Sequence, residues 1–157
     1  MPSNQMDVNF LKQAHEVAQS SRDPSTRVGA VLVSPDLQRV VTGYNRFPEC
    51  VPDRKEWWNN RDDTGEELSK YDLVCCAEQD AILTAHTSVA GWTLYVTHFP
   101  CINCAKSIVF SGIRRVVFVY GVEHIHRPLV ASKVKLLFQM AGVIVEQHPS
   151  SQSVECR

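Results

Sequence analysis

Apolar residues recur at regular spacing along most of the chain, and that spacing predicts the order of its elements. From about Asp7 to Ser20 they lie on one face of a helical period, so an opening helix is expected before Asp23-Pro24. Val28 to Val33 and Arg39 to Tyr44 are runs rich in β-branched residues. The turn residues between these two runs predict an antiparallel hairpin.

Beyond the hairpin, a long polar segment from Asn45 to Asp72 is expected to be functional or partly helical. Helical and extended patterns then alternate. The expected helices are Ala77 to Val89, Ile102 to Phe110 and Leu129 to Met140, and the expected strands are Leu94 to Thr97, Val116 to Tyr120 and Val143 to Val145. Because a helix between two strands returns the chain to the same end of the sheet, the later strands should be parallel.

These patterns predict an α/β fold, a three-layer α/β/α sandwich around a mixed five-stranded sheet whose first hairpin is antiparallel. A length of 157 residues suits one domain. We expect that domain to span 1–148 and the polar tail 149–157 to be disordered.

Bulk composition narrows the compartment and the partners. The net charge of −1 gives no overall attraction to nucleic acid, no apolar run approaches a membrane span, and no secretory signal is visible. A cytoplasmic protein is therefore expected, with neither a membrane nor a nucleic acid as partner. In that compartment, Cys101-x-x-Cys104 favours metal or redox chemistry over a structural disulfide.

The decisive pattern joins Cys76-Ala77-Glu78 to Pro100-Cys101-x-x-Cys104, each at the start of an expected helix. Three thiolates would hold a zinc ion and leave its fourth position open, which is typical of a catalytic site. Glu78 would then move a proton between a water molecule and the substrate. Taken alone, the cysteines could be a redox pair, half of a zinc ribbon or buried core residues.

At these residues the chain resembles the deoxycytidylate deaminases of the cytidine deaminase superfamily, from about Phe10 to Val145. The likeness is carried by four segments: Ser21 to Ala30, Gly43-Tyr44-Asn45, Val74 to Ile82 and Tyr95 to Lys106. It implies a cytidine deaminase-like fold and zinc held by Cys76, Cys101 and Cys104. It also implies that the chain is a homo-oligomeric hydrolase, often a hexamer in this family, that converts dCMP to dUMP in pyrimidine deoxynucleotide metabolism.

The resemblance also suggests residues that contact the substrate. The Ala77 N–H and the Phe99 carbonyl would fix the pyrimidine edge. Asn45 would bind the sugar, unless it is only a turn residue. The candidates for the phosphate are Ser21, Arg22 and Thr26, which could equally form an ordinary turn beside Pro24. Tyr120 would pack on the sugar or phosphate, or would cap the core.

Three departures from the family bear on function. Cys76 stands where the family has histidine. Nucleoside cytidine deaminases also have a cysteine at this position. Ser20 stands where it places an arginine, so the phosphate needs another cation. The loop from Gly43 to Cys50 lacks two glycines of a loop that in the family helps to sense dCTP and dTTP.

Other functions stay open at this point. A nucleoside or 5-modified cytosine deaminase would agree with Cys76. An enzyme acting on tRNA or single-stranded nucleic acid would need a basic tail or groove. A zinc-stabilised structural module would not need Glu78, because a structural site closes its fourth ligand position. A second zinc near Cys50, His86 and His98 is a further alternative.

Overall fold

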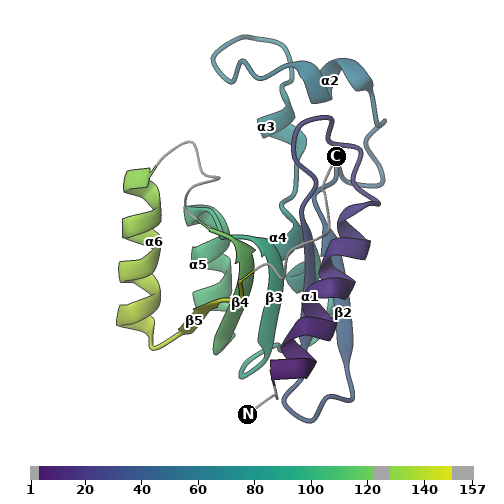
Figure 1. Cartoon of the computed structure of the whole chain (residues 1–157). Coiled ribbons are helices and arrows are strands. Elements are labelled where there is room, and N and C mark those ends of the chain that lie inside the picture. The colour runs from purple at the N-terminus through teal and green to yellow at the C-terminus, as the bar shows by residue number, and fades with distance from the viewer. Residues whose placement is uncertain (1–3, 122–127, 150–157) are drawn as a thin grey trace.

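The computed structural model describes residues 4–121 and 128–149. Its centre is a five-stranded sheet in the order β2-β1-β3-β4-β5. The strands are β1 (Gly29–Val33), β2 (Val40–Tyr44), β3 (Thr93–His98), β4 (Arg115–Tyr120) and β5 (Ile144–Gln147). The helices are α1 (Asn4–Ala18), α2 (Lys55–Asn59), α3 (Lys70–Leu73), α4 (Ala77–Thr84), α5 (Ile102–Phe110) and α6 (Pro128–Ala141). Figure 1 shows the sheet between helices, so the predicted three-layer sandwich is confirmed.

The pairing of the strands follows from the connections between them. β1 and β2 form the predicted antiparallel hairpin, and β1 is also antiparallel to β3. β3, β4 and β5 are parallel to one another, because α5 and α6 return the chain between them. The sheet is therefore mixed, as the alternation of patterns predicts.

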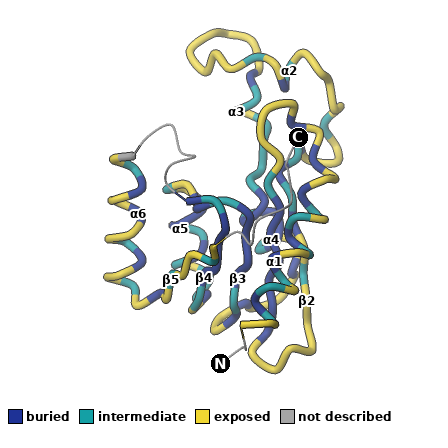
Figure 2. The backbone as a smooth tube through the Cα atoms, in the orientation of Figure 1, coloured by how far each residue is buried: buried dark blue, intermediate teal, exposed yellow. Residues whose placement is uncertain are grey.

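The two faces of the sheet bury separate apolar clusters. On one face, α4, α5 and α6 pack on alternate residues of the strands through side chains such as Ala81, Ile108 and Phe138. On the other face, α1 packs through Leu11 and Ala14. Figure 2 shows buried residues along the central strands, whereas much of the outer side of α6 is exposed. Side chains at successive strand positions enter opposite clusters, which is the period of two read from the sequence.

The first turn of α4 is set close against β2 by Gly43. A Cβ atom on Gly43 would lie 2.4 Å from the carbonyl oxygen of Ala77 and 2.5 Å from the nitrogen of Ala81. Only glycine allows backbones to approach this closely. Gly43 therefore helps to set the distance between α4 and the sheet. That distance in turn helps to position Cys76 and Glu78.

The predicted helix Ala77 to Val89 is too long by about a turn. α4 ends at Thr84, and His86 adopts a positive φ of 50° that no α-helix contains. The chain turns there, while Val89 is buried in the same cluster as α4. Its apolar character reflects packing after the turn, not a continuation of the helix.

The polar segment after β2 is partly helical, as predicted. It contains α2 and α3 and extends beyond the end of the sheet (Figure 1). Backbone hydrogen bonds between Arg46 and Cys75, of 3.1 and 2.9 Å, close its base. Within it, Phe47 stacks on Trp58 with ring centroids 4.0 Å apart. The segment is therefore a folded excursion that starts and ends beside the first zinc motif.

Across the described residues, no helix is both long and apolar enough to cross a membrane. The expected single domain 1–148 stays a prediction, and the tail expected to be disordered lies, from residue 150 onward, outside the described residues.

Candidate active site

Three cysteine thiols converge where α4 and α5 begin. Cys76 is the residue that caps α4, Cys101 caps α5, and Cys104 lies in the first turn of α5. Their Sγ atoms all lie within 4.8 Å of one another. Tetrahedral zinc with Zn–S bonds of about 2.3 Å would place two sulfurs about 3.8 Å apart. The cluster therefore fits a zinc ion after a small contraction, and three ligands leave a fourth position for a further molecule.

Helix geometry explains why these residues meet. Two helix N-termini point at the cluster, and the partial positive charge of a helix N-terminus favours thiolates there. The backbone N–H of Cys104 also donates to Cys101 Sγ at 3.5 Å. One turn of α5 thus positions two of the thiols, and the neighbouring α4 brings the third.

In the metal-free cluster, the three thiols strongly affect one another's pKa values. Hydrogen bonds from the thiols of Cys104 and Cys76 lower the pKa of the Cys101 thiol well below its ordinary value. Donating to Cys101 raises the pKa of Cys104 and of Cys76 above the ordinary thiol value. One thiolate therefore forms readily, whereas zinc must displace the protons of the other two. Zinc affinity should consequently rise with pH.

Glu78 is a buried carboxylic acid that faces the cluster without belonging to it. The residue is 4% exposed, and its Oε2 accepts a hydrogen bond from Cys104 Sγ at 3.6 Å. In the metal-free protein, burial raises the pKa of Glu78 to about 7, and the negative charge of Cys101 adds to this effect. A carboxyl group that gains or loses a proton near neutral pH suits general acid and base catalysis.

The residues after Glu78 hold this helix start in place. Asp80 accepts hydrogen bonds from Arg46 Nε at 3.0 Å and Nη2 at 2.8 Å, and from the backbone N–H of Tyr44 at 3.2 Å. These contacts join the first turn of α4 to the end of β2. Since Asp80 lies two residues after Glu78, the ion pair also restrains the catalytic candidate.

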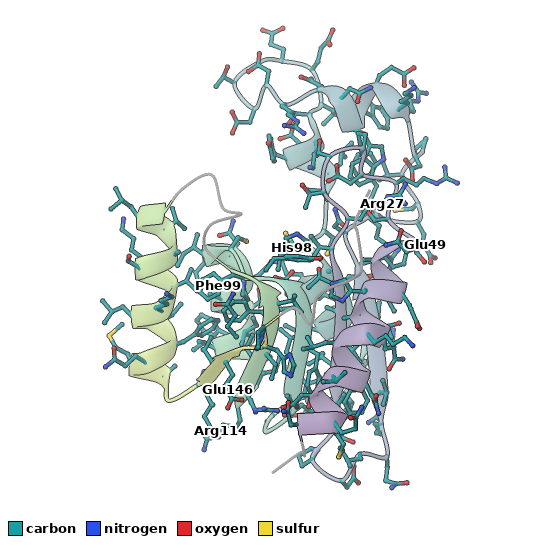
Figure 3. The ribbon with its side chains drawn as sticks, viewed as in Figure 1. Arg27, Glu49, His98, Phe99, Arg114 and Glu146 are labelled. Carbon is teal, nitrogen blue, oxygen red and sulfur yellow. The ribbon has the colours of Figure 1, made fainter. Side chains whose placement is uncertain are left out.

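A cavity of about 840 Å³ opens onto the cluster. Its volume lies in the range of small-molecule sites. Its described lining residues are Asp23, Thr26, Val28, Asn45, Lys70, Tyr71, Val74, Cys76, Ala77, Glu78, Gln79, His98, Phe99, Cys101, Asn103, Cys104, Lys106, Ser107 and Phe110. In Figure 3, His98 and Phe99 lie at the end of β3, below the segment that carries α2 and α3.

Four of the predicted substrate residues line this cavity: Thr26, Asn45, Ala77 and Phe99. Asn45 is buried, and its side chain already donates to Asp23 Oδ2 and the Thr26 carbonyl and accepts from the Val28 N–H. It therefore closes the strand end, as its turn interpretation implies, and also reaches the cavity. Its sugar contact stays a prediction.

The other three predicted substrate residues do not line the cavity. Ser21 is buried, and its hydroxyl donates to the Asn45 carbonyl at 2.8 Å. The Arg22 side chain is 73% exposed, and its Nε lies 3.7 Å from Asp53 Oδ2. Tyr120 packs against His98 with ring centroids 4.9 Å apart. These three roles stay predictions, and none of the three side chains is among the residues that surround the cluster.

Sequence reasoning missed several lining residues. Asn103, Lys106, Ser107 and Phe110 follow the ligands at helical spacing, so the period of α5 could have revealed them. Lys70 and Tyr71 come from α3, and no sequence signal places that short helix over the cavity. Among the described residues, the only group of three or more metal-ligating side chains is Cys76, Cys101 and Cys104, so a second zinc site does not form there.

Comparison with known proteins gives matches to deaminases. Residues 4–120 match the family model described as the cytidine and deoxycytidylate deaminase zinc-binding region. A deoxycytidylate deaminase of Pongo abelii is 39% identical over 136 residues, which are 85% of this chain and 74% of that protein. A deoxycytidylate deaminase of Mycobacterium phage D29 is 34% identical over 119 residues, 71% of this chain and 92% of that protein.

A solved structure agrees with the fold. The dCMP deaminase of cyanophage S-TIM5, crystallised in complex with dCMP and dUMP, superposes with a TM-score of 0.71. The match covers 94% of this chain and all (100%) of that chain, at 23% sequence identity. At this level of identity the comparison supports the arrangement of sheet and helices.

Proposed function

The chain belongs to the cytidine and deoxycytidylate deaminase family, and from that premise we propose that it catalyses the zinc-dependent hydrolytic deamination of dCMP to dUMP. The overall reaction exchanges the amino group at C4 of cytosine for oxygen from water and releases ammonia. Three relatives that are 38–39% identical over 136 residues carry the name deoxycytidylate deaminase, which supports a nucleotide as the substrate.

The observation that carries this proposal is the position of Glu78. Its carboxyl group is buried, contacts Cys104, and is not one of the three residues that would hold zinc. A structural zinc site would gain nothing from such a group, because in a structural site a fourth protein ligand occupies the last position on the metal. When bound, zinc would supply a Lewis acid that makes water a nucleophile near neutral pH.

The chain's own residues would divide the remaining work. Glu78 would accept one proton from the attacking water and deliver it to N3 of the ring, and would then transfer the second proton of the same oxygen to the departing amino group, which leaves as ammonia. The Ala77 N–H and the Phe99 carbonyl, both from residues that line the cavity, would orient the pyrimidine edge.

A nucleoside deaminase is the second candidate, because the chain has three cysteines where nucleotide deaminases have one histidine and two cysteines. A substrate panel separates the two. Zinc-loaded protein is incubated with dCMP, CMP, dCTP, deoxycytidine and 5-methyl-dCMP, and the products are resolved by chromatography. Turnover of dCMP with little turnover of deoxycytidine supports the proposal, whereas turnover of deoxycytidine alone would overturn it in favour of the nucleoside enzyme.

We also propose that the protein acts in the cytoplasm as a homo-oligomer. Thiolate ligands need a reducing compartment if they are to hold zinc and not form disulfides.

The oligomer is supported by the surface. Large apolar side chains are exposed on the helical layer, among them Leu83 of α4, Phe110 of α5 and Met140 of α6. Light scattering of the zinc-loaded protein tests this point, since a monomeric mass would contradict it.

A further inference from the structure

We propose that Lys70 is the cation that selects a phosphorylated substrate, and that buried Asp23 positions it for this role. This inference rests on the proposed deamination of a nucleotide and assigns its specificity to a residue outside the zinc motifs. A nucleotide site needs a cation to bind the phosphate, and Ser20 stands where the family places an arginine. Another cation must therefore bind the phosphate in this chain.

The cations near the start of the chain do not supply that charge. Arg22 lines two other surface pockets and pairs with Asp53. Among the described residues that line the cavity, the lysines and arginines are Lys70 and Lys106. The choice therefore lies between these two lysines.

Lys70 shares its side of the cavity with the predicted substrate residues. Its Nζ lies 2.5 Å from Asp23 Oδ2. The same carboxylate accepts hydrogen bonds from the backbone N–H of Thr26 at 3.3 Å and from Asn45 Nδ2 at 3.2 Å. Asp23 thus gathers the ammonium group, the Thr26 loop and the proposed sugar contact around one point. Lys106, in contrast, extends from α5 on the face that carries Asn103 and Phe110.

The environment of Lys70 also suits the recognition of an anion. Its side chain is 13% exposed and that of Asp23 is 1% exposed, so both charges are largely shielded from water. An ammonium group has three donors, and Asp23 uses one of them. Apart from Asp23 and the ring of Tyr71, 5.9 Å away, the described residues offer the Lys70 ammonium group no further partner. The remaining N–H groups are free for phosphate oxygens, in a position where charge-assisted hydrogen bonds are strong.

Asp23 itself has no capacity left for a substrate. Its Oδ1 accepts from the N–H groups of Ser25 and Thr26, and its Oδ2 accepts from Asn45 and Lys70. We therefore assign Asp23 as a positioning residue that holds the Lys70 ammonium at the cavity wall.

The test compares the binding of two product analogues that differ only in the phosphate. Dissociation constants of dUMP and deoxyuridine are measured by calorimetry on the zinc-loaded protein and on Lys70→Gln, which keeps a donor for Asp23 but removes the charge. Lys106→Ala tests the other lysine, and Lys133→Ala removes an equal charge from the exposed face of α6. Turnover of dCMP by the wild type is measured separately, so that a failure of the proposed function is recognised as such.

We expect the wild type to prefer dUMP, and Lys70→Gln to reduce that preference at least about tenfold without changing deoxyuridine binding. Lys133→Ala should leave both constants unchanged. A structural role would instead weaken both ligands alike in Lys70→Gln. Equal weakening of both ligands in Lys70→Gln would overturn the assignment. So would a wild type that does not distinguish the two ligands, or a loss of preference in Lys106→Ala alone.

Discussion

Glu78 Oε2 accepts a hydrogen bond from Cys104 Sγ at 3.6 Å, across the junction of α4 and α5. The contact joins the two sequence motifs, C-A-E and P-C-x-x-C, in a single buried site. It also separates the roles within the site, because three thiols can hold the metal while the carboxyl group remains available for proton transfer.

Replacing Glu78 tests that division of roles. We expect Glu78→Gln to lower the turnover of dCMP by about 10²–10⁴-fold, the usual contribution of a general acid and base, while zinc content stays unchanged. Turnover is followed by product chromatography, and zinc is measured by atomic emission. Glu56→Gln, on the exposed side of α2, is the matched control. Loss of zinc together with activity would show that Glu78 is a ligand and not an acid or base.

The ligand set gives a second prediction. Cys76→His should keep zinc and part of the activity, because histidine provides a tetrahedral zinc ligand and the remaining two thiols come from one turn of α5. Cys104→Ala should weaken zinc binding by more than the about 10–100-fold expected for loss of an outer-shell contact. Competition with a fluorescent chelator gives both affinities. If Cys76→His bound no zinc, a histidine could not replace the Cys76 thiolate at this position.

Gly43 gives a prediction about stability. A methyl group there would meet the backbone of Ala77 and Ala81 at 2.4 and 2.5 Å, so Gly43→Ala must push α4 away from β2. We expect a loss of about 1–3 kcal/mol in the free energy of unfolding, measured with urea, and weaker zinc binding. Gly65→Ala is the control, since its nearest neighbour is the flexible side chain of Asp62 at 3.3 Å. An equal effect of the two substitutions would contradict the close approach.

The ion pair of Asp7 with Arg115 predicts a dependence of stability on pH. Burial acts to raise the pKa of Asp7, but hydrogen bonds from Arg115 and Tyr95 and the charge of Arg115 outweigh it. The pKa therefore falls below its ordinary value of 3.8. A lowered pKa stabilises the folded state above the ordinary value, and the contribution is lost as the pH falls through the lowered pKa.

The variant Asp7→Asn should thus lose about 1–3 kcal/mol at pH 7, because it leaves Arg115 short of a buried partner. The difference from the wild type should shrink as the pH falls below about 4. Glu146→Gln breaks the more exposed ion pair of the same arginine and should cost less than about 1 kcal/mol. Urea unfolding at several pH values measures all three proteins. A difference between Asp7→Asn and the wild type that did not change with pH would rule out the linkage.

Much of the fold and the metal site could be predicted from the sequence, because both depend on local patterns. The β-branched runs around Val31 and Val117 fix strands, and Ile102 to Phe110 has the period of a helix. The spacing of Cys101 and Cys104 within one helical turn makes their convergence a matter of local geometry.

The remaining features depend on tertiary contacts. His86 adopts a positive φ, and this ends α4 before its apolar pattern ends. Arg22 lies next to Ser21 in the sequence, yet its side chain turns to Asp53. Lys70 reaches the cavity only because the segment that carries α3 folds back onto Asp23, and the two residues are far apart in the chain.

The central claim is that this chain deaminates dCMP by hydrolysis, and isotope incorporation tests it most directly. Zinc-loaded protein is incubated with dCMP in water enriched in oxygen-18, the nucleotide product is analysed by mass spectrometry, and released ammonia is quantified, with Glu78→Gln as the blank. We predict dUMP that carries one oxygen-18 atom, with one ammonia released for each dUMP. Unchanged dCMP in the presence of bound zinc, or a product without the isotope, would contradict the claim.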